Sequence, residues 1–161
     1  MKNKAVRTVF ALLLSALMVL GLCACQVKVH TEVTGSAGKE LQEKVEANLE
    51  NYIRQDDAAA YEAFYPGVVS KSSFPSDFHS FLGYFPITEG YTLTLQDCQP
   101  YRHEDDPEVK LVFGEFTVEF DGQKFYLSVT YAKDQEHEGF QKWHIMSEAD
   151  YEQLNEETQP E

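Results

Sequence analysis

Three cysteines and five histidines are the side chains in this 161-residue sequence best suited to metal binding or nucleophilic catalysis. None of the histidines lies at the spacing that lets two imidazoles bind one metal ion, and no Cys-x-x-Cys pair is present. The sequence also lacks a glycine-rich phosphate loop, a Gly-x-Ser-x-Gly elbow and a catalytic cysteine signature. We therefore predict no metal, no cofactor and no catalytic residue. The histidines are His30, His79, His103, His137 and His144.

Acidic residues are the other group with possible chemistry, and they cluster most densely at Glu104, Asp105, Asp106 and Glu108. This cluster lacks the alternating oxygen ligands and the glycine of an EF-hand loop. We predict a solvated loop, with a weak Ca²⁺ site as the alternative. The whole chain has 27 acidic and 13 basic residues, a net charge of −14, which argues against nucleic acid as a partner.

The N-terminal residues have the pattern of an export signal. Lys2, Lys4 and Arg7 precede an uncharged, mainly apolar run over residues 9–22, which is shorter than the roughly 20 residues of a membrane-spanning helix. The run ends in Leu22-Cys23-Ala24-Cys25. This ending resembles the lipobox of bacterial lipoproteins, with Cys25 as the lipid acceptor, because Cys23 would have leucine at the preceding position. An ordinary secretory signal and a stretched transmembrane anchor are the alternatives.

The lipobox resemblance implies that residues 1–24 are removed and that Cys25 carries a diacylglycerol group. The remaining 137 residues would have a net charge of −17. Two acyl chains suffice for stable anchoring. The expected location is the bacterial cell envelope, at the outer face of the cytoplasmic membrane, or the outer membrane in a Gram-negative host. Cys98 would be the only other cysteine, either a reactive thiol or, as we favour, a small apolar residue at a strand end.

Residues 25–36 are predicted to be a lipidated tether, because they show no helical periodicity and end in turn residues. Fully extended, this tether spans at most about 36–40 Å. Val27, Val29 and Val33 could instead form a short strand.

Three helices are predicted next. The first covers 37–55, where Leu41, Val45, Leu49 and Tyr52 form one apolar stripe and Ser36 is a plausible N-cap. The second covers 58–64 after Asp56-Asp57, and Pro66-Gly67 ends it. The third covers 75–82, with Pro75 at its first position and Gly83 at its end.

Beyond Gly90 the apolar period becomes two, which predicts strands. Alternating runs on both sides of Asp121-Gly122 predict a β-hairpin, in which Gln123 and Lys124 lengthen the loop or begin the second strand. A last strand is expected over 139–146. Residues 148–161 are predicted to be one turn of helix followed by an acidic C-terminal tail. The residues expected to face the core are Leu93, Leu95, Phe116, Val118, Phe120, Phe125, Leu127, Val129, Trp143 and Ile145.

Helices followed by a meander of about four strands predict an α+β fold, with the helices packed on one face of a curved antiparallel sheet. The long helix at 37–55, the segment Asp56–Val68, the strands around Asp121-Gly122 and the closing Gly-Phe…Trp-x-Ile strand resemble the NTF2-like (cystatin-like, SnoaL-like) superfamily. The resemblance covers 37–147 and rests on element order, without a diagnostic motif. The chain is also similar to small NTF2-like lipoproteins of uncharacterised function that Gram-positive bacteria export.

The NTF2-like resemblance implies an enzyme, a pocket binder or a dimerisation module. No carboxylate or imidazole interrupts the predicted inward faces, unless a one-residue register slip turns Glu115, Glu119 and His144 inward. We therefore predict a non-enzymatic domain that binds a protein or a small apolar ligand. The alternatives are a SnoaL-like enzyme with a cryptic acid–base pair and a scaffold that forms a homodimer through the sheet. The many aromatic residues are explained by core packing, with a partly open apolar pocket as the alternative. The residues predicted to form such a pocket are Tyr61, Tyr65, Phe78, His79 and Trp143.

Overall fold

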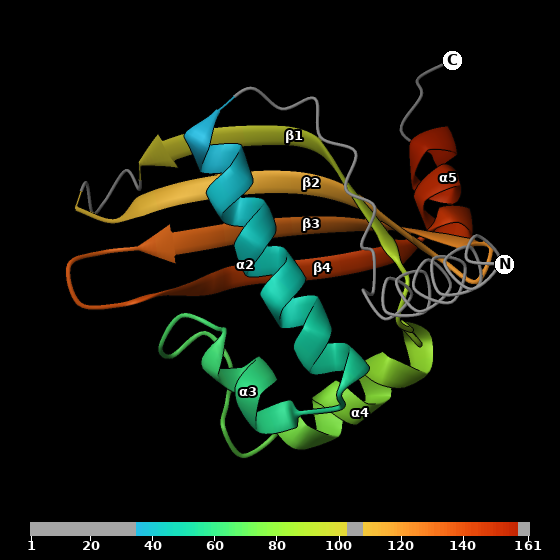
Figure 1. Ribbon diagram of the computed structural model, residues 1–161, viewed down its shortest axis with the longest axis horizontal. Coiled ribbons are helices and arrows are strands. Elements are labelled where there is room, and N and C mark those ends of the chain that lie inside the picture. Colours follow the sequence, from blue (N-terminus) through green and yellow to red (C-terminus); the bar gives the residue numbers. More distant parts are fainter. Residues whose placement is uncertain (1–34, 103–107, 158–161) are drawn as a thin grey trace, which may run out of the picture.

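The computed structural model describes residues 35–102 and 108–157. The signal, Cys25 and nearly all of the tether lie outside these residues, as does the acidic loop apart from Glu108. Three helices, four strands and a last helix follow one another along the described residues (Figure 1). They are α2 Ser36–Ile53, α3 Asp57–Glu62, α4 Phe74–Tyr84, β1 Thr92–Arg102, β2 Lys110–Phe120, β3 Gln123–Lys133, β4 Glu138–Ser147 and α5 Glu148–Glu157.

The strands form one antiparallel sheet in the order β1-β2-β3-β4. Helix α2 crosses one face of this sheet, and α3 and α4 lie beyond it on the β4 side (Figure 1). The predicted α+β fold, with N-terminal helices on a curved four-stranded sheet, is therefore confirmed.

The hairpin predicted at Asp121-Gly122 joins β2 to β3. Both residues have positive φ angles, 49° and 74°, which is the conformation that a tight two-residue loop requires. Phe120 pairs directly with Gln123, so Gln123 and Lys124 begin the second strand and do not lengthen the loop.

The predicted inward faces are confirmed. Nine of the ten residues are buried, and Trp143 is partly buried against the same core. Glu115, Glu119 and His144 are exposed on the opposite face, so the one-residue register slip is excluded. Such a slip would have exchanged a continuous apolar surface for charged side chains.

Strand β1 continues past a β-bulge between Leu95 and Asp97 and ends only at Arg102. The extra residue at the bulge changes which alternate side chains of β1 face the core. Cys98 consequently lies opposite Gly114, in the middle of the strand rather than at its end, and is partly buried against the core. Burial and the neighbouring carboxylate of Asp97 both raise the pKa of the Cys98 thiol, which lowers its reactivity.

Several predicted helix ends are wrong. Gly35, not Ser36, is the N-cap of α2, and Gly83 lies inside α4, which continues to Tyr84. Helix α3 stops at Glu62 because the next residues pair with the edge of the sheet. Ala63 accepts a hydrogen bond from the Phe140 backbone, and Tyr65 donates one back to it. This pairing covers part of the exposed edge of β4.

The C-terminal segment contains a ten-residue helix, α5, where a single helical turn was predicted. Tyr151 of α5 stacks on Tyr126 of β3, with ring centroids 3.8 Å apart. Tyr126 lies on the sheet face opposite α2, so α5 covers part of that outer face. Self-association through the sheet stays a prediction. Within the described ranges, no helix has the length and hydropathy needed to cross a membrane.

Candidate functional site

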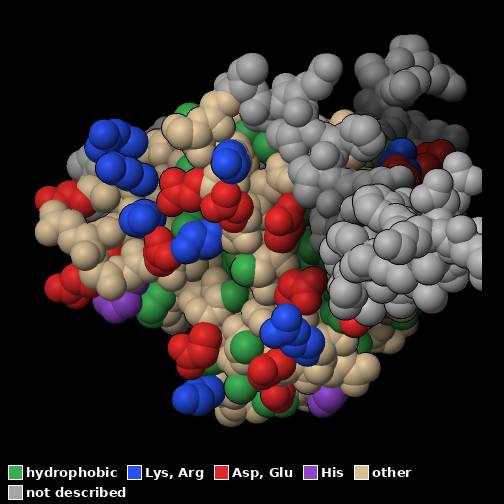
Figure 2. Space-filling view, viewed as in Figure 1, with side chains coloured by type: hydrophobic (Ala, Val, Ile, Leu, Met, Phe, Trp, Pro, Cys, Tyr) green, Lys and Arg blue, Asp and Glu red, His purple; other side chains and the backbone are tan. Residues whose placement is uncertain are grey.

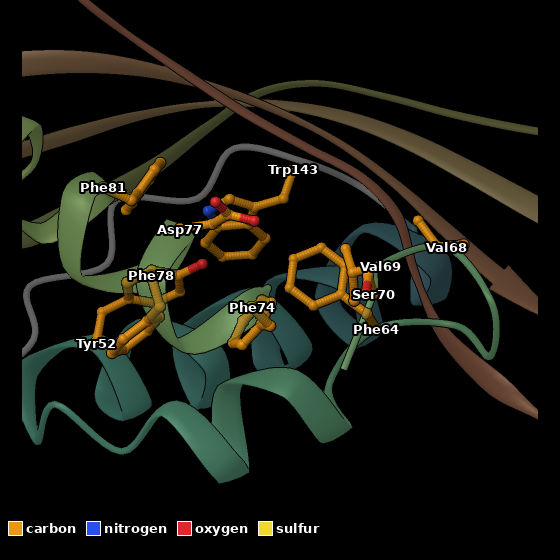
Figure 3. Close-up of a pocket in the computed structure, with 10 residues that line it drawn as sticks. All are labelled: Tyr52, Phe64, Val68, Val69, Ser70, Phe74, Asp77, Phe78, Phe81 and Trp143. Carbon is orange, nitrogen blue, oxygen red and sulfur yellow. The ribbon is translucent and has the colours of Figure 1, made fainter. Parts of the chain in front are cut away.

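A cavity of about 380 Å³ lies among α2, α4, β4 and the segment that follows α3 (Figure 3). Six of its ten lining residues are aromatic, and together they form most of its wall. The lining consists of Tyr52, Phe64, Val68, Val69, Ser70, Phe74, Asp77, Phe78, Phe81 and Trp143.

Local sequence patterns explain why α2, α4 and β4 direct their lining side chains toward the same cavity. Tyr52 ends the apolar stripe of α2. Phe74, Phe78 and Phe81 recur at spacings of four and three along α4, so they share a face of that helix. Trp143 lies on the inward side of β4, opposite Val129. The cavity is therefore the place where an apolar stripe from each helix meets the edge of the sheet.

The aromatic rings around the cavity hold one another in place. The Tyr52 ring centroid lies 4.8 Å from that of Phe78 and 5.1 Å from that of Phe81. It also lies 5.8 Å from the Trp143 ring, and these two rings are parallel to within 6°. Phe140 packs edge-on against Trp143 at 4.8 Å. Such contacts are typical of rigid aromatic packing, so the wall is largely preformed.

Few polar groups reach the cavity. The indole Nε1 of Trp143 is buried and has no hydrogen-bond partner within 35–102 and 108–157. An unsatisfied buried donor costs about 1–3 kcal/mol, so an acceptor at this position would be stabilising. Burial raises the pKa of the Tyr52 hydroxyl, which is therefore neutral at physiological pH. Ser70 and Asp77 are exposed at the edge.

The structure brings only two of the five predicted binding residues together: Phe78 and Trp143 both line the cavity. His79 is exposed and does not line the aromatic cavity. Tyr61 lines a neighbouring surface pocket of about 190 Å³, where the Lys71 ammonium lies 5.8 Å from its ring centroid.

Tyr65 has a different role from the one predicted. Its hydroxyl donates a hydrogen bond to Asp134 in the β3–β4 connection, and its ring packs against a small cluster of Val109, Leu111 and Ala132. The hydrogen bond from Tyr65, together with those from the backbone N–H groups of His137 and Glu136, lowers the pKa of the Asp134 carboxyl. Tyr65 therefore stabilises the β3–β4 loop and does not line the cavity.

Sequence reasoning missed eight of the ten lining residues as binding residues. The concentration of aromatic side chains in the helical half is the signal that could have found four of them: Tyr52, Phe64, Phe74 and Phe81. No sequence signal distinguishes Val68, Val69, Ser70 and Asp77, which reach the cavity only through the path of the chain after α3 and the start of α4.

A second cavity, of about 240 Å³, lies where the first turns of α2 meet the sheet, and it has a different chemistry. Lys44, Lys110 and Lys133 line it together with Glu40 and Tyr131. Lys44 and Lys133 both pair with Glu138, and these contacts lower the pKa of its carboxyl and raise that of Lys44. The positive charge there is thus partly neutralised.

Neither a metal-type cluster nor an imidazole is part of the aromatic cavity in the described residues. No three His, Cys, Asp or Glu side chains in 35–102 and 108–157 gather as a possible metal site. His144, the imidazole nearest in sequence to Trp143, faces away from the aromatic cavity on the outer side of β4. What the cavity can do is enclose a small apolar molecule between aromatic walls, with the buried indole N–H of one wall residue, Trp143, unpaired within the described ranges.

No protein-family model, curated protein or solved structure matches this chain.

Proposed function

We propose that this chain is an exported, lipid-anchored protein whose NTF2-like domain binds a small apolar ligand in the aromatic cavity. The observation that carries the binding proposal is the indole N–H of Trp143, a buried wall residue of the cavity, which has no acceptor among the described residues. Buried polar groups in folded proteins are nearly always paired. A ligand with an oxygen acceptor and an apolar body would pair this donor.

The size of the cavity supports the same proposal. Small-molecule sites are typically clefts of roughly 300–1,000 Å³ with apolar and aromatic walls and a few placed polar groups. The aromatic cavity, at about 380 Å³, falls at the lower end of that range. It therefore suits a compact ligand of one or two rings better than a long acyl chain or a peptide.

The envelope location rests on the sequence, through the resemblance of Leu22-Cys23-Ala24-Cys25 to a lipobox. Helix α2 begins at Ser36, so only ten residues separate Cys25 from the described domain. At 3.3–3.6 Å per residue, the domain would stay within about 40 Å of the membrane surface. Its binding site would then sample molecules in the space next to that membrane.

The binding proposal can be tested with the fluorescence of Trp143, which is the only tryptophan of the chain. Propiophenone, an aryl ketone, should bind the unlipidated chain and change this fluorescence. Propylbenzene, its analogue without the carbonyl, should bind about two- to tenfold more weakly, because it cannot accept the indole hydrogen bond.

The matched variant is Trp143→Phe, which keeps an aromatic wall and removes the donor. Calorimetry on this variant should show similar affinities for the ketone and the hydrocarbon, with an unfolding midpoint near that of the unsubstituted chain. If neither probe alters Trp143 fluorescence up to its solubility limit, the binding proposal is wrong.

The anchor has a separate test. Mass spectrometry of the protein from a bacterial host should find an N-terminal Cys25 that carries a diacylglycerol group, and Cys25→Ala should abolish lipidation and release the chain from membranes. Cys23→Ala should leave both unchanged. A mature N-terminus at another, unmodified residue would contradict the lipoprotein assignment.

A further inference from the structure

We propose that the ligand of the aromatic cavity carries an ammonium group, held between the Asp77 carboxylate and the aromatic rings. This inference rests on the proposed binding function and names the chemical class of its ligand. It commits to a cation whose remainder is an apolar body with the oxygen acceptor that pairs the Trp143 N–H.

The charges of the lining residues are the first argument. Asp77 is the only charged side chain of the ten, and none of them is Lys, Arg or His. The carboxylate of Asp77 makes no hydrogen bond or ion pair with any residue in the described ranges. Lys71 is nearby in sequence, but it lies over the Tyr61 ring in the neighbouring pocket. The cavity therefore has one unpaired negative charge at its edge (Figure 3).

The aromatic rings are the second argument. A cation within about 6 Å of an aromatic ring centroid is attracted by the negative face of the ring, and tryptophan attracts it most strongly. Tyr52 and Trp143 lie parallel at 5.8 Å, and the Phe78 and Phe81 rings adjoin Tyr52. Several rings thus border a single cavity, and an ammonium group lying over the face of any of them would be attracted more strongly than a neutral group of the same shape.

The surrounding field is the third argument. The chain has 27 acidic residues against 13 basic ones, and acidic side chains are scattered over the face shown in Figure 2. Such a field attracts cations and repels anions. The described lysines that line a cavity with Tyr131 gather at the other end of α2. An anionic ligand would therefore be expected there and not at the aromatic cavity.

Asp77 has one structural explanation that must be separated from ligand binding. It lies in the first turn of α4, where a carboxylate interacts favourably with the positive end of the helix dipole. That role predicts an effect of Asp77 on stability and none on ligand selectivity. The discriminating measurement is therefore a ratio of affinities and not a melting temperature.

The experiment compares two probes of the same shape, phenyltrimethylammonium and tert-butylbenzene, by titration of Trp143 fluorescence in the unlipidated chain. The cation should bind about tenfold more tightly, the size expected of an ammonium near aromatic rings and one carboxylate. Asp77→Asn should reduce this ratio to about threefold or less and leave the affinity for tert-butylbenzene unchanged.

The control variant is Glu115→Gln, which removes one exposed carboxylate from the outer face of β2. It should leave the ratio at its original value, because Glu115 does not line the cavity and exposed charges are screened by salt. An equal loss of selectivity in both variants would overturn the assignment to Asp77, since it would implicate the overall charge.

The remaining outcomes are also decisive. Equal binding of the two probes, or tighter binding of the anion 4-tert-butylbenzoate, would overturn the cation inference and leave the binding function standing. Failure of all probes, propiophenone included, would remove the binding function and this inference with it.

Discussion

Substituting alanine at Gly139 is expected to destabilise the domain by about 3 kcal/mol, at the upper end of what overpacking usually costs. A Cβ atom at Gly139 would lie 2.4 Å from the backbone nitrogen of Tyr65 and 2.5 Å from the carbonyl carbon of Phe64. These backbone atoms cannot turn away as a side chain can. The neighbouring hydrogen bonds between Phe140 and the 63–65 segment hold them against β4, so the added methyl group must break that pairing.

The measurement for Gly139→Ala is urea unfolding followed by circular dichroism. Gly83→Ala is the matched control, because a Cβ there has no atom within 4 Å and Gly83 lies in α4. That control should stabilise the domain by up to about 1 kcal/mol, the propensity difference between the two residues in a helix. An unfolding free energy for Gly139→Ala within 0.5 kcal/mol of the unsubstituted chain, a margin of about the measurement error, would contradict the close approach of 63–65 to β4.

Phe85→Ala is expected to cost about 3–5 kcal/mol, as is typical of a large aromatic side chain removed from a core. Phe85 is fully buried, and its ring centroid lies 5.7, 5.4 and 5.0 Å from those of Phe81, Phe120 and Phe125. Phe85 immediately follows α4, while Phe120 and Phe125 flank the β2–β3 turn. The cavity left by alanine would therefore loosen the end of α4 from the sheet.

Two further variants make the Phe85 prediction specific. Phe85→Leu retains most of the buried volume and should cost less than half as much as Phe85→Ala. Phe113→Ala removes the same ring from a partly exposed position on the outer face of β2 and should cost about 1–2 kcal/mol. Equal losses for Phe85→Ala and Phe113→Ala in urea unfolding would show that the Phe85 cluster is not part of the core.

Local pattern was enough to predict the strands and the direction of their side chains. The alternation on both sides of Asp121-Gly122 placed Phe116, Val118, Phe125 and Leu127 on one face, and all four are buried. The reason is that strand periodicity and a two-residue turn are properties of adjacent residues, which need no information from the rest of the chain. The amphipathic stripe of α2 was predictable for the same reason.

Local pattern failed where distant segments meet. The end of α3 at Glu62 depends on pairing with Phe140, which is more than 70 residues away, and no periodicity before Pro66 indicates it. Tyr65 was predicted to bind a ligand because it is one of many tyrosines in the helical half. Its side chain instead reaches Asp134 in the loop after β3. Aromatic composition identified the correct region but not which side chains face the cavity.

By itself, the sequence determined the α+β order, the inward faces of the strands, the acidic surface and the lipobox-like ending at Cys25 that predicts an anchor. All of these depend on residue type and short spacings. Only the tertiary structure decided that Tyr52, Phe78 and Trp143 border one cavity, that Asp77 lies at its edge, and that the Trp143 N–H has no acceptor among the described residues. The physical reason is that a cavity is the space between α2, α4 and β4 after they pack, and that space is fixed by contacts such as those of Gly139 and Phe85, not by any one segment.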